Sequence, residues 1–293
     1  MKEPSRRTLT LALALTPGIG GKSITRILTR NDLMGRTIPA FLQYSAETLR
    51  EEYRIKPAVA LAWAEGWQDR ISEAESLQKR LDPLKVTLVT AADAHYPRLI
   101  EALDPDPPGV LYLYGNTRLL ESRTFCAVSS RGSSDEAHAQ LDKIVEEGVL
   151  AGRTLVSGHD TPEYQRAAVV PLRWGAPRIL VLDCGLFQAL GPDLKEEPFR
   201  AARVWRFQFD PRTDLVVSAV NPESEYHRNS NKIRDRLVGG LSLTLDFITI
   251  KPNGNMHRLA IQALKAGRVV RISDLSPLAP ELRRQGAQVI PSE

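Results

Sequence analysis

The chain has 293 residues, of which 42% are hydrophobic and 25% are charged, a composition typical of a globular protein with one large domain and a small one. Its two cysteines lie far apart inside apolar segments, and no run reaches the roughly 20 apolar residues of a membrane span, which disfavours a disulfide framework, a zinc ribbon and a membrane protein and favours a reducing cytoplasm. The net charge of +4 permits a polyanionic partner without requiring one, because 39 basic residues are interspersed with 35 acidic ones.

The first part of the chain, residues 8–80, has the apolar spacing of helices. Its stretch LTLALALTPGIGGKSITRILTR predicts a helix, a tight turn at Pro17 and Gly18, and a second helix. Two arginines before a short apolar run resemble an export signal, but the apolar pattern continues through Ile24 and Ile27, so we expect a folded helical unit. The period changes near residues 81–85. We therefore predict a helical domain at residues 1–82 and a second domain at residues 83–293.

The second domain alternates strand and helix patterns. Strands are expected at residues 86–89, 110–114, 124–128, 154–157, 178–182, 215–220, 243–250 and 268–272. Helices are expected at residues 135–150, 162–174, 229–241 and 255–266. Strands that recur with crossover helices predict an α/β fold with a doubly wound, mostly parallel sheet. Ligands of such sheets bind beyond the carboxyl ends of the strands, at the point where the strand order reverses.

The loop SSRGSS at residues 129–134 follows one of these strands and leads into a helix that opens with an Asp-Glu pair. Small residues at this position let backbone amides gather around an anion, and Arg131 at the helix entrance is suited to bidentate contact with a phosphate. A serine-rich turn that caps the helix, with a solvated arginine, accounts for the same residues equally well. The loop is neither a dinucleotide fingerprint nor a Walker A loop, because G-x-G-x-x-G and G-K-[ST] are both absent from it.

A second candidate is the basic stretch HRNSNKIRDRLVGGLS at residues 227–242. It holds Arg228, Lys232, Arg234 and Arg236 against one acidic residue, Asp235. Such a run is usually a solvated helix face. Here it leads into an apolar helix end and a strand, which places its basic residues at the loop edge of the sheet, beside Arg131.

Catalytic motifs are missing from the sequence. We find no H-E-x-x-H, G-x-S-x-G or C-x-x-C, and the five histidines are scattered, without metal-binding spacing to acidic residues. His159 and Asp160 in the loop SGHDTP could form an acid/base pair, but we expect Asp160 to cap the helix that follows. We therefore predict no catalytic residue, no metal ligand and no cofactor.

The order of motifs resembles the DNA-processing protein A (DprA/Smf) family. YPRLIEALDPDPPGVLYLYGN (residues 96–116), GRTLVSGH (152–159) and RDRLVGGLS (234–242) carry the resemblance, which extends from about residue 9 to 273. It implies a Rossmann-like domain preceded by a small helical domain of SAM-like or helix-hairpin-helix type. It also implies a non-enzymatic protein that binds single-stranded DNA, forms a homodimer, and hands DNA to a RecA-type recombinase. We keep duplex DNA open as a second ligand.

The loop chemistry and the resemblance together give one set of candidate residues for contact with DNA or its phosphates. These are Ser129, Ser130, Arg131, Ser133, Ser157, Gly158, Arg228, Lys232, Arg234, Arg236, Asn253 and Gly254. The chain departs from the family pattern at Ser129 and at positions around this set. Ser129 replaces a glycine, Asp235 turns R-N-R into R-D-R where a phosphate is expected, and Ala168 and Thr249 replace a histidine and an acid. We expect a diverged member that lacks the C-terminal winged helix.

Two other functions stay open at this stage. One is a regulatory, antitoxin or sensing component of an antiphage-defence or toxin-antitoxin cassette, which would bind DNA, a nucleotide or a cognate toxin through the same fold. The other is a nucleotide phosphoribohydrolase of the LOG type. Those enzymes carry P-G-G-x-G-T-x-x-E, and the corresponding PNGNMHRLA at residues 252–260 has neither the second glycine nor the glutamate.

Overall fold

The computed structural model describes residues 3–227 and 229–292. They divide into two compact units. Unit 1 contains the chain up to Tyr96 together with Asp106–Tyr112, and unit 2 contains Pro97–Pro105 and the chain from Leu113 onward. No helix in the described part of the chain is long and apolar enough to cross a membrane.

Unit 1 is helical, as the apolar spacing predicts. Its helices are α1 (Arg6–Leu15), α2 (Gly21–Leu33), α3 (Ile38–Leu42), α4 (Ala46–Tyr53) and α5 (Pro57–Leu81), followed by strand β1 (Thr87–Thr90). Hydroxyl side chains cap three of the helices, because the first N–H groups of a helix have no partner within it; the caps are Ser5, Thr37 and Ser45. Phe41 packs edge-on against Tyr53, with ring centroids 5.3 Å apart, in the middle of the core.

Unit 2 contains most of a parallel sheet. The strands are β2 (Val110–Gly115), which begins in unit 1, β3 (Thr124–Val128), β4 (Thr154–Gly158), β5 (Arg178–Leu182), β6 (Leu215–Ser218), β7 (Thr244–Phe247), β8 (Val269–Ser273) and β9 (Gln288–Ile290). The order is β1-β2-β6-β5-β4-β3-β7-β8-β9, and every pairing from β6 to β9 is parallel. The chain moves outward from β3 to β6 and then returns to the other side of β3 with β7. The switch point of the fold therefore lies between β3 and β7.

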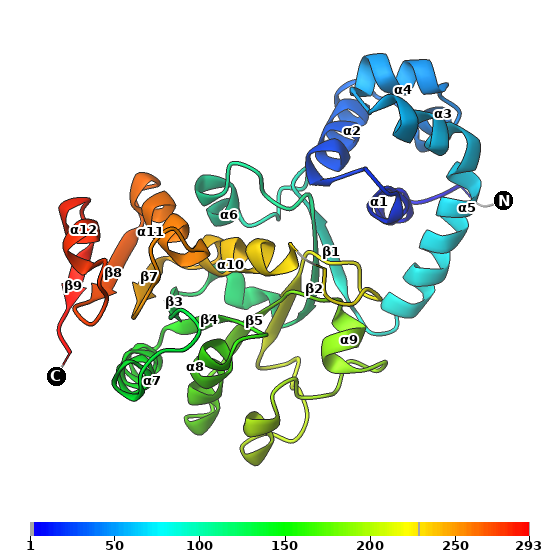
Figure 1. Cartoon of the computed structure of the whole chain (residues 1–293). Coiled ribbons are helices and arrows are strands. Elements are labelled where there is room, and N and C mark those ends of the chain that lie inside the picture. Colours follow the sequence, from blue (N-terminus) through cyan, green and yellow to red (C-terminus); the bar gives the residue numbers. More distant parts are fainter. Residues whose placement is uncertain (1–2, 228, 293) are drawn as a thin grey trace. The chain divides into compact units, whose positions relative to one another are not determined.

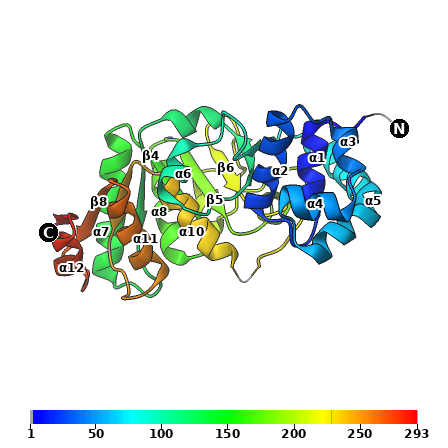
Figure 2. The same ribbon diagram turned by 90° about the horizontal axis from the view of Figure 1, so that it is seen from above.

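Helices cover both faces of this sheet. They are α6 (Arg98–Leu103), α7 (Asp135–Leu150), α8 (Pro162–Arg173), α9 (Leu186–Leu190), α10 (Ser230–Gly240), α11 (Asn255–Lys265) and α12 (Ala279–Arg284), with 3₁₀ turns η1 (Thr117–Glu121) and η2 (Arg200–Val204). Figure 1 shows α7 and α8 on one face and α10 and α11 on the other. Figure 2, seen from above, looks onto α6, α10 and α11. The central strands β3, β4 and β5 are buried along their whole length, as expected for a sheet covered on both faces.

The predicted α/β fold with a doubly wound sheet is confirmed, and all eight predicted strands are present. Strand β9 and the short helices α6, α9 and α12 are absent from the sequence-based prediction. The predicted strand at 243–250 is too long, because regular pairing ends at Phe247. Beyond it the chain still follows the end of β3: Ile248 donates its N–H to the carbonyl of Val128 (2.9 Å), and Ser130 donates to the carbonyl of Thr249 (2.7 Å).

A buried ion network joins the amino ends of β5 and β6. The fully buried Arg178 donates from Nη2 to Oε2 of Glu197 (2.6 Å) and from Nε to Oδ2 of Asp214 (2.9 Å). Arg206 adds a second cation to Asp214, with Nη1 2.7 Å from Oδ2. Two guanidinium groups and two carboxylates thus balance each other, and all of them except the partly exposed Arg206 are fully buried. Removing one partner leaves a buried charge without compensation.

We expect Arg178→Met to lower the free energy of unfolding by about 3–5 kcal/mol, because both carboxylates lose their buried cation. Arg166→Met is the matched control, since Arg166 pairs with Asp142 at the surface (Nη2 to Oδ2, 2.7 Å), where such a pair contributes about 0–1 kcal/mol. Urea denaturation of the two variants and the unaltered protein measures the difference. Equal losses in both variants would contradict the assignment.

Candidate functional site

The loop after β3 is held to the end of β7 by a network of hydroxyl groups. Oγ of the buried Ser129 lies 2.7 Å from Oγ of Ser133 and 2.8 Å from Oγ1 of Thr249, and it accepts a hydrogen bond from the N–H of Thr249 (3.2 Å). Ser133 also donates to the carbonyl of Ser130 (2.8 Å). Gly132 takes a φ of +80°, a conformation that favours glycine. The Ser129 side chain therefore stabilises the loop after β3 through hydrogen bonds on its buried side.

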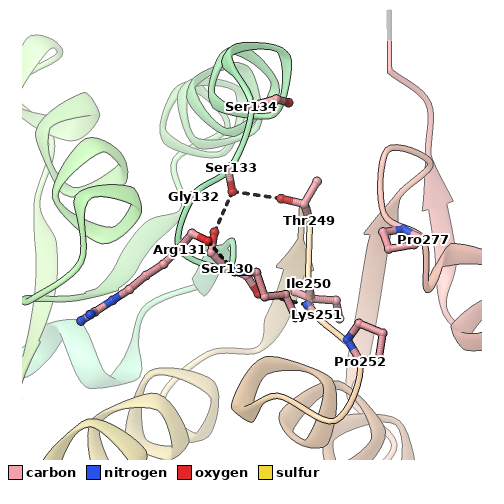
Figure 3. A pocket seen from close by; sticks show the side chains of 10 residues that line it. All are labelled: Ser130, Arg131, Gly132, Ser133, Ser134, Thr249, Ile250, Lys251, Pro252 and Pro277. Atoms are coloured by element: carbon pink, nitrogen blue, oxygen red, sulfur yellow. Dashed lines mark hydrogen bonds between the residues drawn. The ribbon is translucent and has the colours of Figure 1, made fainter.

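A pocket of about 230 Å³ opens between this loop and the residues after β7. It is lined by Ser130, Arg131, Gly132, Ser133, Ser134, Thr249, Ile250, Lys251, Pro252 and Pro277. In Figure 3 a hydrogen bond joins the Ser133 and Thr249 side chains, while the Arg131 side chain extends away from Thr249. The pocket lies at the switch point between β3 and β7, where ligands of doubly wound sheets bind.

Two cationic side chains lie beside the pocket. The Arg131 side chain is 67% exposed and donates from Nη2 to Oδ2 of Asp160 (2.6 Å). Lys251 is exposed, and its Nζ donates to the carbonyl of Arg131 (3.0 Å), while its N–H donates to Oγ of Ser130 (3.1 Å). The helix-capping interpretation and the anion-binding interpretation of the loop sequence thus each describe part of the loop. Ser134 caps α7 by accepting the N–H of Ala137, and the exposed arginine lies beside a pocket.

The loop after β4 is tied to α8 by buried polar groups. Ser157 donates its hydroxyl to the carbonyl of Tyr164 (2.9 Å). The buried Glu163 accepts the N–H of Gly132 (2.9 Å), which links this loop to the loop after β3. The prediction that Asp160 caps α8 is wrong. Thr161 caps the helix by accepting the N–H of Tyr164 (3.2 Å), and the Asp160 carboxylate instead pairs with two arginines.

Arg234 on α10 is the second arginine on Asp160, and only 3% of its side chain is exposed. Its Nη1 pairs with Oδ1 of Asp160 and lies 3.6 Å from Oδ2 of Asp183, and its Nε donates to Oδ1 of Asp235 (2.8 Å). The guanidinium also lies over the Tyr164 ring, 4.8 Å from its centroid. Burial lowers the pKa of Arg234, and the Asp235 carboxylate opposes this shift. Arg234 is thus surrounded by three carboxylates and is not exposed to solvent.

Tyr164 completes this cluster from α8. Burial, and next the charge of Asp235, raise the pKa of Tyr164 well above its usual value. The phenol therefore stays protonated and donates to Oδ1 of Asp235 (3.0 Å). Gly158 makes room for both neighbours, since a Cβ there would lie 2.6 Å from Cδ2 of Tyr164 and 2.7 Å from Cδ of Arg234.

The remaining candidate residues lie around this edge. Asn253 has a φ of +59° and donates its N–H to Nδ1 of His257 (3.1 Å), and Gly254 precedes the first turn of α11. Lys232 is exposed on α10. Arg236 turns toward a different carboxylate, with Nε 3.2 Å from Oδ2 of Asp104. Arg228 lies outside the described residues.

Sequence reasoning missed several residues of the site. Thr249, Lys251 and Glu163 contact the loop after β3, and Thr249 and Lys251 follow a strand directly, which is the signal that identified Arg131. It also found no metal-binding spacing in the sequence. In the structure, one donor atom each of His159, Asp183 and Cys184, from the loops after β4 and β5, lies within 4.8 Å of the other two.

Comparisons with known proteins agree with this architecture and define the class of protein. The family model for DNA recombination-mediator protein A matches residues 87–289, which is more than half of the chain. The chain therefore belongs to the DNA recombination-mediator protein A family. A comparison with curated proteins gave no match.

Two solved structures show the shared fold. DNA processing protein A from Streptococcus pneumoniae has a TM-score of 0.72 and 19% identity, covering 95% of this chain and 92% of its own. DNA processing protein A from Helicobacter pylori has a TM-score of 0.55 and 19% identity, covering 71% of this chain and 91% of its own. The latter structure is described in terms of a single-stranded DNA binding mode.

We expect Arg234→Met to lower the free energy of unfolding by about 3–5 kcal/mol at neutral pH, because three carboxylates lose their buried partner. Without the guanidinium, three negative charges remain close together in a site with little access to water. Protonation at lower pH removes their repulsion, so the loss relative to the unaltered protein shrinks as the pH falls. Chemical denaturation at several pH values measures this.

Lys232→Met is the control, since it removes an exposed cation from the same helix and should change stability by less than about 0.5 kcal/mol. A loss for Arg234→Met that stays constant with pH would show that the carboxylates are not the cause.

Proposed function

We propose that this chain binds single-stranded DNA along the carboxyl edge of its sheet and seats one backbone phosphate in the pocket between the loops after β3 and β7. The observation that carries this proposal is the pair of exposed cations, Arg131 and Lys251, beside a pocket at the switch point of the fold. Membership in a family of DNA recombination mediators supports it, as does the single-stranded DNA binding described for the H. pylori protein.

Arg131 is the residue best placed to hold the phosphate. Its pairing with Asp160 is solvent-exposed on the arginine side, where an ion pair contributes about 0–1 kcal/mol, so an incoming phosphate competes with it on favourable terms. A guanidinium offers a phosphate two parallel N–H donors. Lys251 contributes from the opposite wall, and its Nζ retains N–H donors beyond the one given to the carbonyl of Arg131.

The amino end of α7 adds less to the affinity for a phosphate than its position implies. Helix N-termini attract anions through unpaired N–H groups and the helix dipole. Asp135 and Glu136 in the first turn already complement that partial positive charge. The affinity for a phosphate therefore depends on the two side-chain cations, which makes binding sensitive to salt.

The other candidate residues have different parts in this proposal. Ser129 and Ser133 fix the loop, and Ser157 and Gly158 fix its neighbour. Arg234 acts as a positioning residue, because it holds Asp160, which in turn orients Arg131. Lys232 adds charge at the surface. Since Arg234 is buried and paired, DNA contact falls to Arg131 rather than to Arg234.

A binding role without catalysis is part of the proposal, as are the partners that the family resemblance implies, a second copy of the chain and a RecA-type recombinase. Light scattering of the purified chain tests the dimer. Co-sedimentation of the recombinase with the chain on single-stranded DNA tests the second partner. Release of a free base from nucleoside monophosphates, as by a phosphoribohydrolase, would overturn the non-enzymatic assignment.

We expect Arg131→Ala to weaken binding of a fluorescent oligonucleotide about tenfold, which corresponds to about 1.4 kcal/mol. Arg131→Ala and Lys251→Ala should each reduce the slope of log affinity against log salt by about 0.7, the value for one phosphate of a single strand. Fluorescence anisotropy across a salt series measures both quantities.

Lys265→Ala is the matched control, because this exposed lysine ends α11 and so lies at the amino edge of the sheet. It should leave the slope unchanged. Binding that is insensitive to salt, or an unchanged slope in both pocket variants, would refute the proposed phosphate site.

A further inference from the structure

Three side chains with potential metal-donor atoms of different chemistry converge where the loops after β4 and β5 meet. His159 follows β4, and Asp183 and Cys184 follow β5. One donor atom from each lies within 4.8 Å of the other two, and Nδ1 of His159 is 3.5 Å from Oδ1 of Asp183. Asp183 and Cys184 are buried, with 3% and 8% exposure, while 22% of the His159 side chain is exposed.

The atom of His159 that faces Asp183 is unsatisfied. Nδ1 of His159 is inaccessible to water and has no hydrogen-bond partner among the described residues. Oδ2 of Asp183 likewise accepts no hydrogen bond there, although Nη1 of Arg234 lies 3.6 Å from it. The His159 ring is stacked on Phe199, with centroids 5.7 Å apart and an interplanar angle of 26°, which holds its Nδ1 near Asp183. Leaving a buried polar atom unpaired is unfavourable, and an ion that accepts the Nδ1 lone pair would remove this cost.

The charge of the cluster favours a cation. Three carboxylates, Asp160, Asp183 and Asp235, surround the single buried guanidinium of Arg234. Arg131, the other cation on Asp160, pairs with it at 2.6 Å, so three carboxylates face two guanidinium groups and leave a formal excess of one negative charge. The Cys184 thiolate that forms on metal binding adds a second negative charge, and one divalent ion would neutralise both.

From this geometry we propose that His159, Asp183 and Cys184 bind a zinc-type divalent ion. Zinc bonds of about 2.0–2.3 Å in a tetrahedral arrangement place the ligand atoms roughly 3.3–3.8 Å apart. The 3.5 Å between Nδ1 and Oδ1 already fits this range, and closing the set from at most 4.8 Å requires a shift of about 1 Å by a side chain. The nitrogen, oxygen and sulfur donors suit zinc rather than magnesium or calcium.

The site would have an open position. Three protein ligands leave the fourth tetrahedral position to water or to an anionic oxygen. Burial raises the pKa of Cys184 to about 12, so the metal-free protein carries a thiol there. On binding, a metal–sulfur bond forms, the S–H bond breaks and the proton passes to solvent.

Cobalt(II) is the probe, because it occupies zinc sites and reports its ligands by absorption. We expect the full-length chain, stripped with a chelator, to bind one Co²⁺ per chain and to develop a sulfur-to-cobalt charge-transfer band. Zn²⁺ should displace the Co²⁺, and excess Mg²⁺ should not. Cys184→Ala should abolish the charge-transfer band, and His159→Ala should weaken Co²⁺ binding at least about tenfold, which corresponds to about 1.4 kcal/mol.

Cys126→Ala is the matched control, since Cys126 is the other buried cysteine and lies in β3, outside the cluster. It should bind Co²⁺ with the same band as the unaltered protein. His159→Ala provides a second test at a partly exposed residue should Cys184→Ala fail to fold, as judged by circular dichroism. Absence of stoichiometric binding, a band that survives Cys184→Ala, or equal loss in Cys126→Ala would overturn the proposal. None of these readouts requires DNA, so the metal site is tested independently of the proposed DNA binding.

Discussion

The buried guanidinium of Arg234 is the interaction on which the carboxyl edge of the sheet depends. It joins Asp160 after β4, Asp183 after β5 and its own neighbour Asp235 on α10. A charge with so little exposure is tolerated only with partners, because desolvation costs several kcal/mol per ion. The loops after β4 and β5 are therefore fixed relative to α10. Gly158 belongs to the same constraint, since any side chain there would meet the Arg234 side chain.

Asp160 connects the buried Arg234 to the surface of the protein. One carboxylate oxygen pairs with buried Arg234 and the other with exposed Arg131, so a single acid connects a buried cation to an exposed one. Under the proposed function, a phosphate in the pocket would replace Asp160 as the partner of Arg131 at small cost, because water already screens that pair. The same exchange at Arg234 would expose a desolvated cluster. The difference in burial thus gives different roles to Arg131 and Arg234, two arginines that look equivalent in the sequence.

The sequence predicts the sheet well because its signals are local. Continuous apolar runs such as 179–182 alternate with amphipathic helices, and the strand ends and loops at their carboxyl side contain Arg131, Ser157 and Gly158, which lie at the same edge. Strand β9 is missed because three partly polar residues carry no periodicity. The His159, Asp183 and Cys184 cluster is missed because only the pairing of β4 with β5 brings its members together.

The position of Arg234 on the buried face of its helix could be predicted from helical spacing. It precedes Leu237 by three positions and Val238 by four, both fully buried, so it lies on the face of α10 that packs inward, whereas Lys232 lies on the solvent side. A count of basic residues in 227–242 does not separate these faces. The number of carboxylates that would meet Arg234 follows only from the tertiary structure.

The contacts of Asp235 give it a different role from the one expected from the sequence. As a departure from R-N-R, it was expected to place a negative charge where a phosphate sits. Its side chain is instead buried, accepts hydrogen bonds from Tyr164, Arg234 and Asn255, and lies among the groups that hold Arg234. The substitution therefore leaves the pocket beside Lys251 unobstructed and acts on it only through the electrostatic field. A divalent ion at Asp183 would offset that field, so occupation of the metal site and of the phosphate pocket would each strengthen the other.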